Sequence, residues 1–184
     1  FLVERLPAVL HPDSAGIIAA VGEGVRDFSP GDRVYAFANG LGGKPGALAE
    51  RMTVDARMVA PMPSGLDFEQ AAALPLVSVT AWFALVHAAS VKAGDTVLVM
   101  GGTGGVGHVA VQLAKARGAT VAAACGSEEK MRIAADLGAD IVFNYRDTDP
   151  ADLAGLAPGG QGFDIVFNTP GEPAIDAAVA ACRF

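Results

Sequence analysis

The chain has 184 residues, 52% of them hydrophobic, and its 13 basic and 20 acidic residues give a net charge of −7. This acidic balance argues against a nucleic-acid partner and against binding to an anionic membrane surface. No uninterrupted apolar run reaches the ~18 residues of a membrane-spanning helix, so we expect a soluble protein.

The cysteines and the N-terminus bear on where the protein works. Cys125 and Cys182 lie far apart and outside any Cys-x-x-Cys pattern, so we expect no disulfide framework and a reducing, cytoplasmic setting. The first residues have no basic region followed by a long apolar run, unlike a signal peptide. Because the chain does not begin with Met, we expect it to be a piece of a longer protein.

The first third of the chain alternates short apolar runs with turn residues. Turn signals lie at 22–24 and 29–32, and a glycine-rich loop is predicted at 39–46. The predicted strands cover residues 16–21, 33–37, 47–54 and 58–62. Short strands at this spacing are typical of a small β-barrel-like domain.

The composition changes after Pro63. Residues 64–73 predict a turn and a short helix, which Pro75 should break. Residues 77–89 carry apolar side chains on every face, which predicts a buried connecting helix with Trp82 and Phe83 in the core. We place the domain boundary here, with domains at 1–75 and 76–184.

Residues 95–107 join an apolar run to a glycine pattern. The run 96–100 predicts a strand buried on both faces of a parallel sheet, and apolar residues from 106 to 117 recur at helical spacing. Gly102, Gly104 and Gly107 fit the pattern G-x-G-x-x-G. Between a strand and a helix, this pattern indicates a turn that receives a pyrophosphate on free N–H groups; the alternative is a purely structural turn.

Strands and helices alternate in the rest of the chain. Strands are predicted at 120–125, 141–143 and 164–167, and helices at 128–137, 152–156 and 172–181. Repeated strand–helix units indicate an α/β fold, a Rossmann-type doubly wound parallel sheet that follows the β-rich domain.

Several segments carry a resemblance to a known family. They are residues 6–10, 13–16, 21–25, 30–34, 71–75, 80–82 and 104–107. In this order they resemble the medium-chain dehydrogenase/reductase superfamily, and within it the zinc-free quinone oxidoreductase branch. The resemblance implies a GroES-like substrate domain, a Rossmann domain and an active site in the cleft between them. It also implies that both domains are partial here and that the complete protein is a homodimer.

The positions of the zinc ligands in this superfamily hold other residue types. Zinc alcohol dehydrogenases have Gly-His-Glu where this chain has His11-Pro12-Asp13, and their later cysteine ligand falls on Leu76. The segment 38–52, where the structural zinc lobe should lie, contains no cysteine. We therefore predict no zinc. His11 is solitary, and we interpret it as structural rather than as a ligand or an acid catalyst.

The expected acid of an NAD site is missing. About 20 residues after Gly107, where a carboxylate would bind the ribose hydroxyls, the chain has Ser127. In the resembling reductases, a serine, a lysine and a tyrosine surround the 2′-phosphate of NADPH, which corresponds here to Ser127, Lys130 and Tyr145. Alternatively, Ser127 is only a helix N-cap and Lys130 is only solvated, and two glutamates beside them would repel a phosphate. We predict NADPH rather than NADH.

The candidate cofactor-binding residues lie at the glycine turn and after the following strands. They are Gly102, Thr103, Gly104, Gly105, Val106, Gly107, Gly126, Ser127, Lys130, Tyr145 and Asn168.

The resemblance implies hydride transfer from NADPH to a quinone or to the β-carbon of an α,β-unsaturated carbonyl. Thr80 matches a family residue near the nicotinamide and is the candidate catalytic residue, unless its hydroxyl only bonds its own helix backbone. We interpret His87 and His108 as packing residues, and Cys125 as an inert thiol. Two alternatives stay open: a zinc-type alcohol dehydrogenase relative and a non-catalytic NADPH-binding protein. The expected partner is a small molecule, with no nucleic acid or membrane.

Overall fold

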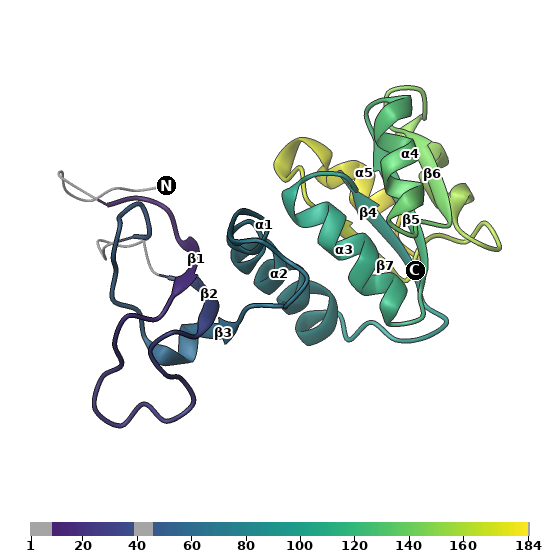
Figure 1. The fold of residues 1–184 in the computed structure, drawn as a ribbon. Coiled ribbons are helices and arrows are strands. Elements are labelled where there is room, and N and C mark those ends of the chain that lie inside the picture. Colours follow the sequence, from purple (N-terminus) through teal and green to yellow (C-terminus); the bar gives the residue numbers. More distant parts are fainter. Residues whose placement is uncertain (1–8, 39–45, 184) are drawn as a thin grey trace. The chain divides into compact units, whose positions relative to one another are not determined.

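The computed structural model describes residues 9–38 and 46–183. The chain divides into two compact units, Phe1–Leu76 and Val77–Phe184 (Figure 1). The predicted loop at 39–46 lies outside the described residues except for Gly46. Within the described ranges, no helix is both long enough and apolar enough to cross a membrane.

The first unit contains a three-stranded antiparallel sheet with the order β1-β2-β3. Its strands are β1 (Asp13–Ile17), β2 (Arg33–Phe37) and β3 (Val59–Pro61), and a 3-10 turn η1 (Ala56–Met58) precedes β3. The predictions for 33–37 and 58–62 are confirmed, although β3 is shorter than predicted. The small barrel-like pattern thus corresponds here to three paired strands.

Two strand predictions in this unit are wrong. The strand predicted at 16–21 begins and ends earlier, since β1 ends at Ile17, opposite Arg33, the first residue of β2. Beyond it, the Ile18 N–H donates to the Asp32 carbonyl at 3.0 Å and the Gly31 N–H donates to the Ile18 carbonyl at 2.9 Å. Residues 47–54 form bends and irregular backbone rather than a strand. Here the N–H groups of Ala47 and Leu48 donate to the carbonyls of His11 and Leu10 instead of to a sheet ladder.

Three helical segments follow. α1 (Phe68–Ala72) begins with a capping box, in which Asp67 accepts from the Gln70 N–H and Gln70 accepts from the Asp67 N–H. As predicted, the first helix ends before Pro75. Pro75 then begins α2 (Pro75–Trp82), since the first turn of a helix needs no proline N–H. A π-helical segment, η2 (Phe83–Ala88), continues from α2.

The connecting helix is only partly buried, which corrects the prediction of a buried segment. Ala81 and Leu85 are buried, but Trp82 and Phe83 are 54% and 60% exposed and therefore are not core residues. Apolar residues on every face did not imply burial on every face.

The second unit contains a four-stranded parallel sheet with the order β6-β5-β4-β7 (Figure 1). Its strands are β4 (Thr96–Met100), β5 (Thr120–Cys125), β6 (Ile141–Asn144) and β7 (Ile165–Asn168). Its helices are α3 (Gly105–Ala116), α4 (Glu128–Asp136) and α5 (Ile175–Ala180), with 3-10 segments η3 (Pro150–Leu156) and η4 (Glu172–Ala174). The predicted doubly wound parallel sheet is confirmed.

The core lies on both faces of this sheet, because successive strand residues point to opposite sides. On one face, Val97 and Val99 of β4 pack with Val111 of α3 and Ala134 of α4. On the other face, the neighbouring β4 and β5 residues pack with η3, α5 and Phe163; the buried residues there are Leu98, Met100, Ala122, Ala124, Leu153, Ala157, Phe163, Ala178 and Ala181. Burial on both faces explains why β4 and β5 lack a polar alternation.

Candidate functional site

The glycine turn between β4 and α3 is fastened to the neighbouring strand. The N–H groups of Gly101 and Gly102 both donate to the Ala124 carbonyl at 3.1 Å, and the Gly104 N–H donates to the Gly101 carbonyl at 2.9 Å. Gly101 has a φ of +77°, in the region that glycine adopts without strain. The backbone therefore holds this turn at the carboxyl end of β4.

Two glycines of the pattern have no room for a side chain. A Cβ at Gly102 would lie 2.8 Å from the Ala123 Cβ, and a Cβ at Gly107 would overlap the Gly101 carbonyl oxygen. Gly104 is less confined, since a Cβ there would lie 3.2 Å from the Gly101 oxygen. The neighbouring strand β5 thus requires glycine at 102, and the close approach of α3 to the turn requires glycine at 107.

The N-terminus of α3 is suited to an anion. Gly104 is its N-cap and makes no side-chain hydrogen bond, and the first turn holds no acidic residue. The first N–H groups of a helix have no partner within the helix, and the helix dipole is positive at this end. Gly105, Val106 and Gly107 therefore present donors to a bound phosphate. The His108 ring Nδ1 lies 3.1 Å from the Gly104 carbonyl, so this half-buried ring is already engaged.

Three candidate residues lie just after β5, namely Gly126, Ser127 and Lys130. The Ser127 hydroxyl accepts a hydrogen bond from the Lys130 N–H at 3.3 Å and caps α4. A serine that accepts in this way keeps its own O–H as a donor. Burial raises the pKa of the Cys125 thiol, while the charge of Lys130 opposes the shift; its Sγ donates to the Lys130 carbonyl at 3.5 Å.

Tyr145 lies against Gly126. The Tyr145 N–H donates to the Cys125 carbonyl at 3.0 Å, and a Cβ at Gly126 would lie 2.9 Å from the tyrosine Oη. The guanidinium carbon of Arg146 lies 5.9 Å from the centre of the Tyr145 ring. The structure thus brings together the ends of β5 and β6, with a hydroxyl, an aromatic ring and two nearby cations.

The end of β7 lies on the other side of the glycine turn. Asn168 pairs with Met100 in the sheet register, and its amide is engaged with the Gly171 backbone: Nδ2 donates to the carbonyl at 2.9 Å and Oδ1 accepts from the N–H at 3.1 Å. The sequence analysis missed Thr169, whose hydroxyl donates to the Met100 carbonyl at 2.6 Å beside Gly101. In the sequence, only its place after a strand-end asparagine could have drawn attention to Thr169, and that place does not reveal its bond to Met100.

Thr80 is exposed on α2. Val77, one turn earlier on the same side of this helix, has its Cγ1 3.5 Å from where a Cβ of Gly105 would lie. This contact places that side of α2 next to the N-terminus of α3. His87 is also exposed and lies 5.2 Å from Phe83, ring centre to ring centre, so it is not a buried packing residue.

The donor set expected for zinc does not fit. His11 is exposed, and Pro12 and Leu76 offer no ligand atom at the two family positions. The Asp13 carboxylate accepts the Leu76 N–H at 2.8 Å, and burial raises the pKa of Asp13. Among residues 9–38 and 46–183, no group of three or more histidine, cysteine or acidic side chains could hold a metal.

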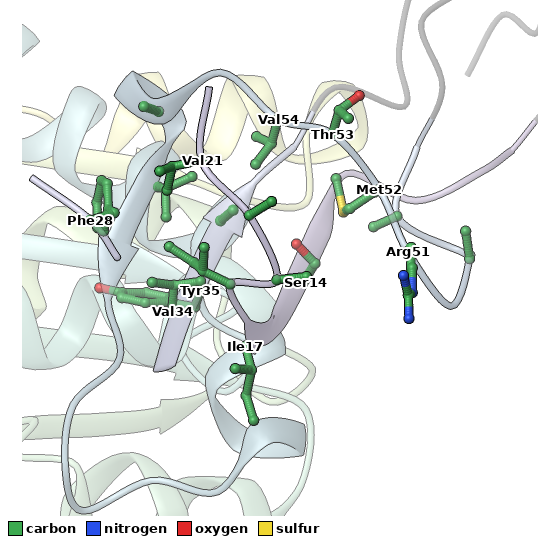
Figure 2. Close-up of a pocket in the computed structure, with 18 of the residues that line it drawn as sticks. Ser14, Ile17, Val21, Phe28, Val34, Tyr35, Arg51, Met52, Thr53 and Val54 are labelled. Carbon is green, nitrogen blue, oxygen red and sulfur yellow. The ribbon is translucent and has the colours of Figure 1, made fainter. Parts of the chain in front are cut away.

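A pocket of about 1060 Å³ lies in the first unit, and none of the candidate site residues lines it. Figure 2 shows apolar side chains around it, among them Ile17, Val21, Phe28 and Val34, with Tyr35 beside them. The residues that line it all belong to the first unit.

Comparisons with known proteins agree with this arrangement. Residues 2–64 match the alcohol dehydrogenase GroES-like domain, and residues 105–184 match the zinc-binding dehydrogenase family. The quinone oxidoreductase of Rattus norvegicus is 40% identical over 88% of the chain and 48% of that protein.

Solved structures are similar as well. An alcohol dehydrogenase superfamily protein from Novosphingobium aromaticivorans superposes with a TM-score of 0.92 at 45% identity, over 97% of this chain and 53% of that one. Escherichia coli quinone oxidoreductase complexed with NADPH gives a TM-score of 0.85 at 30% identity, over 100% of this chain and 55% of that one.

The chain belongs to the medium-chain dehydrogenase/reductase superfamily, with a GroES-like domain followed by a Rossmann-type domain. Its relatives include quinone oxidoreductases. The chain spans about half the length of the quinone oxidoreductases that it matches.

Proposed function

We propose that the protein transfers hydride from NADPH to a quinone or to the β-carbon of an α,β-unsaturated carbonyl, without zinc. One observation carries the proposal: a confined glycine turn opens a helix that has no acid in its first turn. The NADPH complex of the similar Escherichia coli quinone oxidoreductase supports the choice of cofactor.

The reduced nicotinamide, when bound, supplies the hydride, so the residues of this chain mainly bind and orient. The N–H groups of Gly105 and Val106 would hold the pyrophosphate, together with the turn that includes Gly102 and Thr103. Gly126, Ser127, Lys130 and Tyr145 would surround the ribose 2′-phosphate, while Asn168 would order the loop on the nicotinamide side. The hydroxyl of Ser127, the close contact of Tyr145 with Gly126 and the engaged amide of Asn168 support these assignments.

We place Thr80 beside the reacting carbons, because the same side of α2 lies next to the start of α3. Without a metal, the developing oxyanion needs hydrogen-bond donors or water in place of a Lewis acid. A threonine hydroxyl can act as such a donor. The free cysteines, Cys125 and Cys182, support a reducing cytoplasmic location, and we propose a homodimer for the complete protein.

The test is the loss of NADPH absorbance in the complete protein, with a quinone and an enone offered separately. Reduction of either acceptor supports the proposal, and the ratio of the two rates identifies the substrate class. Binding of NADPH with neither acceptor reduced would favour the non-catalytic alternative.

The zinc-free part needs its own measurement. The purified protein should contain no stoichiometric zinc and should keep its activity after treatment with a chelator. One bound zinc per chain together with alcohol oxidation would instead identify a zinc-type alcohol dehydrogenase.

A further inference from the structure

The strands β6 and β7 end in the same tetrapeptide, Ile-Val-Phe-Asn, and both asparagines fasten the loop that follows. In β7, both polar groups of Asn168 bond the backbone of Gly171. In β6, the Asn144 Oδ1 accepts the Arg146 N–H at 3.1 Å, and its Nδ2 donates to the Asp147 carboxylate. Each asparagine therefore shapes a loop at the carboxyl edge of the sheet.

The Asn144 turn is bonded at several further points. The Asp147 N–H donates to the Asn144 carbonyl at 3.1 Å, and the Thr148 hydroxyl donates to the same carbonyl at 2.9 Å. Between these bonds stand Tyr145, which lies against Gly126, and Arg146. Because both ends of its amide are engaged, Asn144 acts through the residues that the turn presents.

The bond to Asp147 also affects charge. Asp147 is an exposed acid one residue from Arg146, in a region where a phosphate would need cations. The Asn144 amide holds this carboxylate, and release would let it pair with Arg146 and compete with a bound phosphate.

We propose that Asn144 is a positioning residue for cofactor choice: it presents Tyr145 and Arg146 to the 2′-phosphate of NADPH and restrains Asp147. This inference rests on the proposed NADPH site at the ends of β5 and β6. It adds a residue that makes no contact with the cofactor itself.

The test compares dissociation constants for NADPH and NADH, measured by fluorescence titration of the complete protein. Asn144→Ala should weaken NADPH binding about tenfold, the equivalent of one hydrogen bond to a charged group. It should weaken NADH binding by less than about twofold. The exchanged pair Asn144→Asp with Asp147→Asn keeps the acceptor for the Arg146 N–H, a side-chain bond across the turn and the net charge. It should restore most of the NADPH affinity.

Asn168→Ala is the matched control, since it removes the same side chain after the same tetrapeptide. Its loop lies on the nicotinamide side, so it should weaken both dinucleotides alike. A purely structural role of Asn144 would lower the melting temperature and leave the NADPH-to-NADH ratio unchanged, and that result would overturn the inference. If Asn144→Ala fails to fold, Asn144→Asp and the exchanged pair test the inference instead. Asn144→Asp alone should bind NADPH more weakly than wild type, and the exchanged pair should regain that affinity.

The two proposals fail differently. A wild-type protein that prefers NADPH, with variants that keep this preference, would refute the role of Asn144 alone. A wild-type protein that binds neither dinucleotide would refute the proposed function, and this inference with it.

Discussion

A Cβ added at Gly107 would overlap the backbone of Gly101, whereas a Cβ added at Gly22 would meet no atom within 4 Å. The same contrast holds for Gly102 in the second unit and Gly16 in the first. At Gly107 glycine is required by the close approach of α3 to the turn, and at Gly102 by the Ala123 methyl group of β5. In the first unit, Gly24 and Gly31 adopt positive φ values of +87° and +98° with open space around them, while Gly46 is confined by the carbonyl oxygens of Leu10 and His11.

Aspartates of the two units differ in a similar way. Asp13 in the first unit and Asp164 in the second each accept a backbone N–H from a distant segment. Burial raises the pKa of Asp13, while bonds from the Thr96 backbone and hydroxyl lower the pKa of Asp164. The charged forms of the two aspartates therefore contribute to stability with opposite signs, although each accepts a backbone N–H. Their different surroundings decide the sign.

The largest expected effect is that of Gly107→Ala. The new methyl group meets backbone, which cannot move aside, so the substitution should cost about 3 kcal/mol of unfolding free energy and remove NADPH binding. Chemical denaturation and titration measure the two effects. Gly22→Ala is the control and should change stability by less than about 0.5 kcal/mol; equal losses in both variants would contradict the comparison.

Gly102→Ala should cost less, about 1–2 kcal/mol, because the new methyl group would overlap its nearest neighbour less, with the Ala123 Cβ at 2.8 Å. Removing that methyl group in the double variant Gly102→Ala with Ala123→Gly should recover part of the loss. Denaturation of both single variants and the double variant forms a thermodynamic cycle. Strict additivity of the two losses would show that the methyl groups do not meet.

Asp164→Asn should destabilise the protein at neutral pH by about 1 kcal/mol, since a charge-assisted acceptor becomes a neutral one. The lowered pKa of Asp164 means that its contribution is present above the ordinary value of 3.8 and is lost as the pH falls through the lower folded value. Unfolding free energies measured from neutral pH down to about pH 3 should therefore converge for wild type and variant. A constant gap would contradict this assignment.

Asp13→Asn should have the smallest effect and the opposite sign. A raised pKa means that the Asp13 contribution is greatest below 3.8 and is lost as the pH rises through the folded value, so the charged form is unfavourable at neutral pH. Asparagine keeps an acceptor for the Leu76 N–H, and we expect stabilisation of less than about 1 kcal/mol at neutral pH. Destabilisation comparable to that of Asp164→Asn would erase the distinction between the two carboxyls.

The second unit could be predicted closely from the sequence because its signals are local. β4 and β5 have the predicted bounds, 96–100 and 120–125, since each is a short run buried on both faces and bounded by turns. The strands of the first unit depend on their partners: β1 ends opposite the first residue of β2, which no pattern within 16–21 reveals.

In the candidate site, too, local features could be predicted from the sequence, whereas contacts between distant residues could not. The glycine turn carries its own signature, so it could be located before the structure was known. Thr169 could not, because its partner Met100 lies 69 residues away in the sequence. Asn144 acts over two to four residues, but an asparagine after a strand has many uses, and only the bonds to 146–148 distinguish this one.

The segment that follows β6 closes on itself, because Asn144 bonds to residues 146, 147 and 148 and one backbone bond joins Tyr145 to β5. The side chains at 145 and 146 can therefore be exchanged while the hydrogen bonds of the turn stay in place. A library that varies 145 and 146 but keeps Asn144, Asp147 and Thr148 would retain the scaffold of the turn while it samples new surfaces. Selection on such a library could change which dinucleotides the protein binds without disturbing the glycine turn.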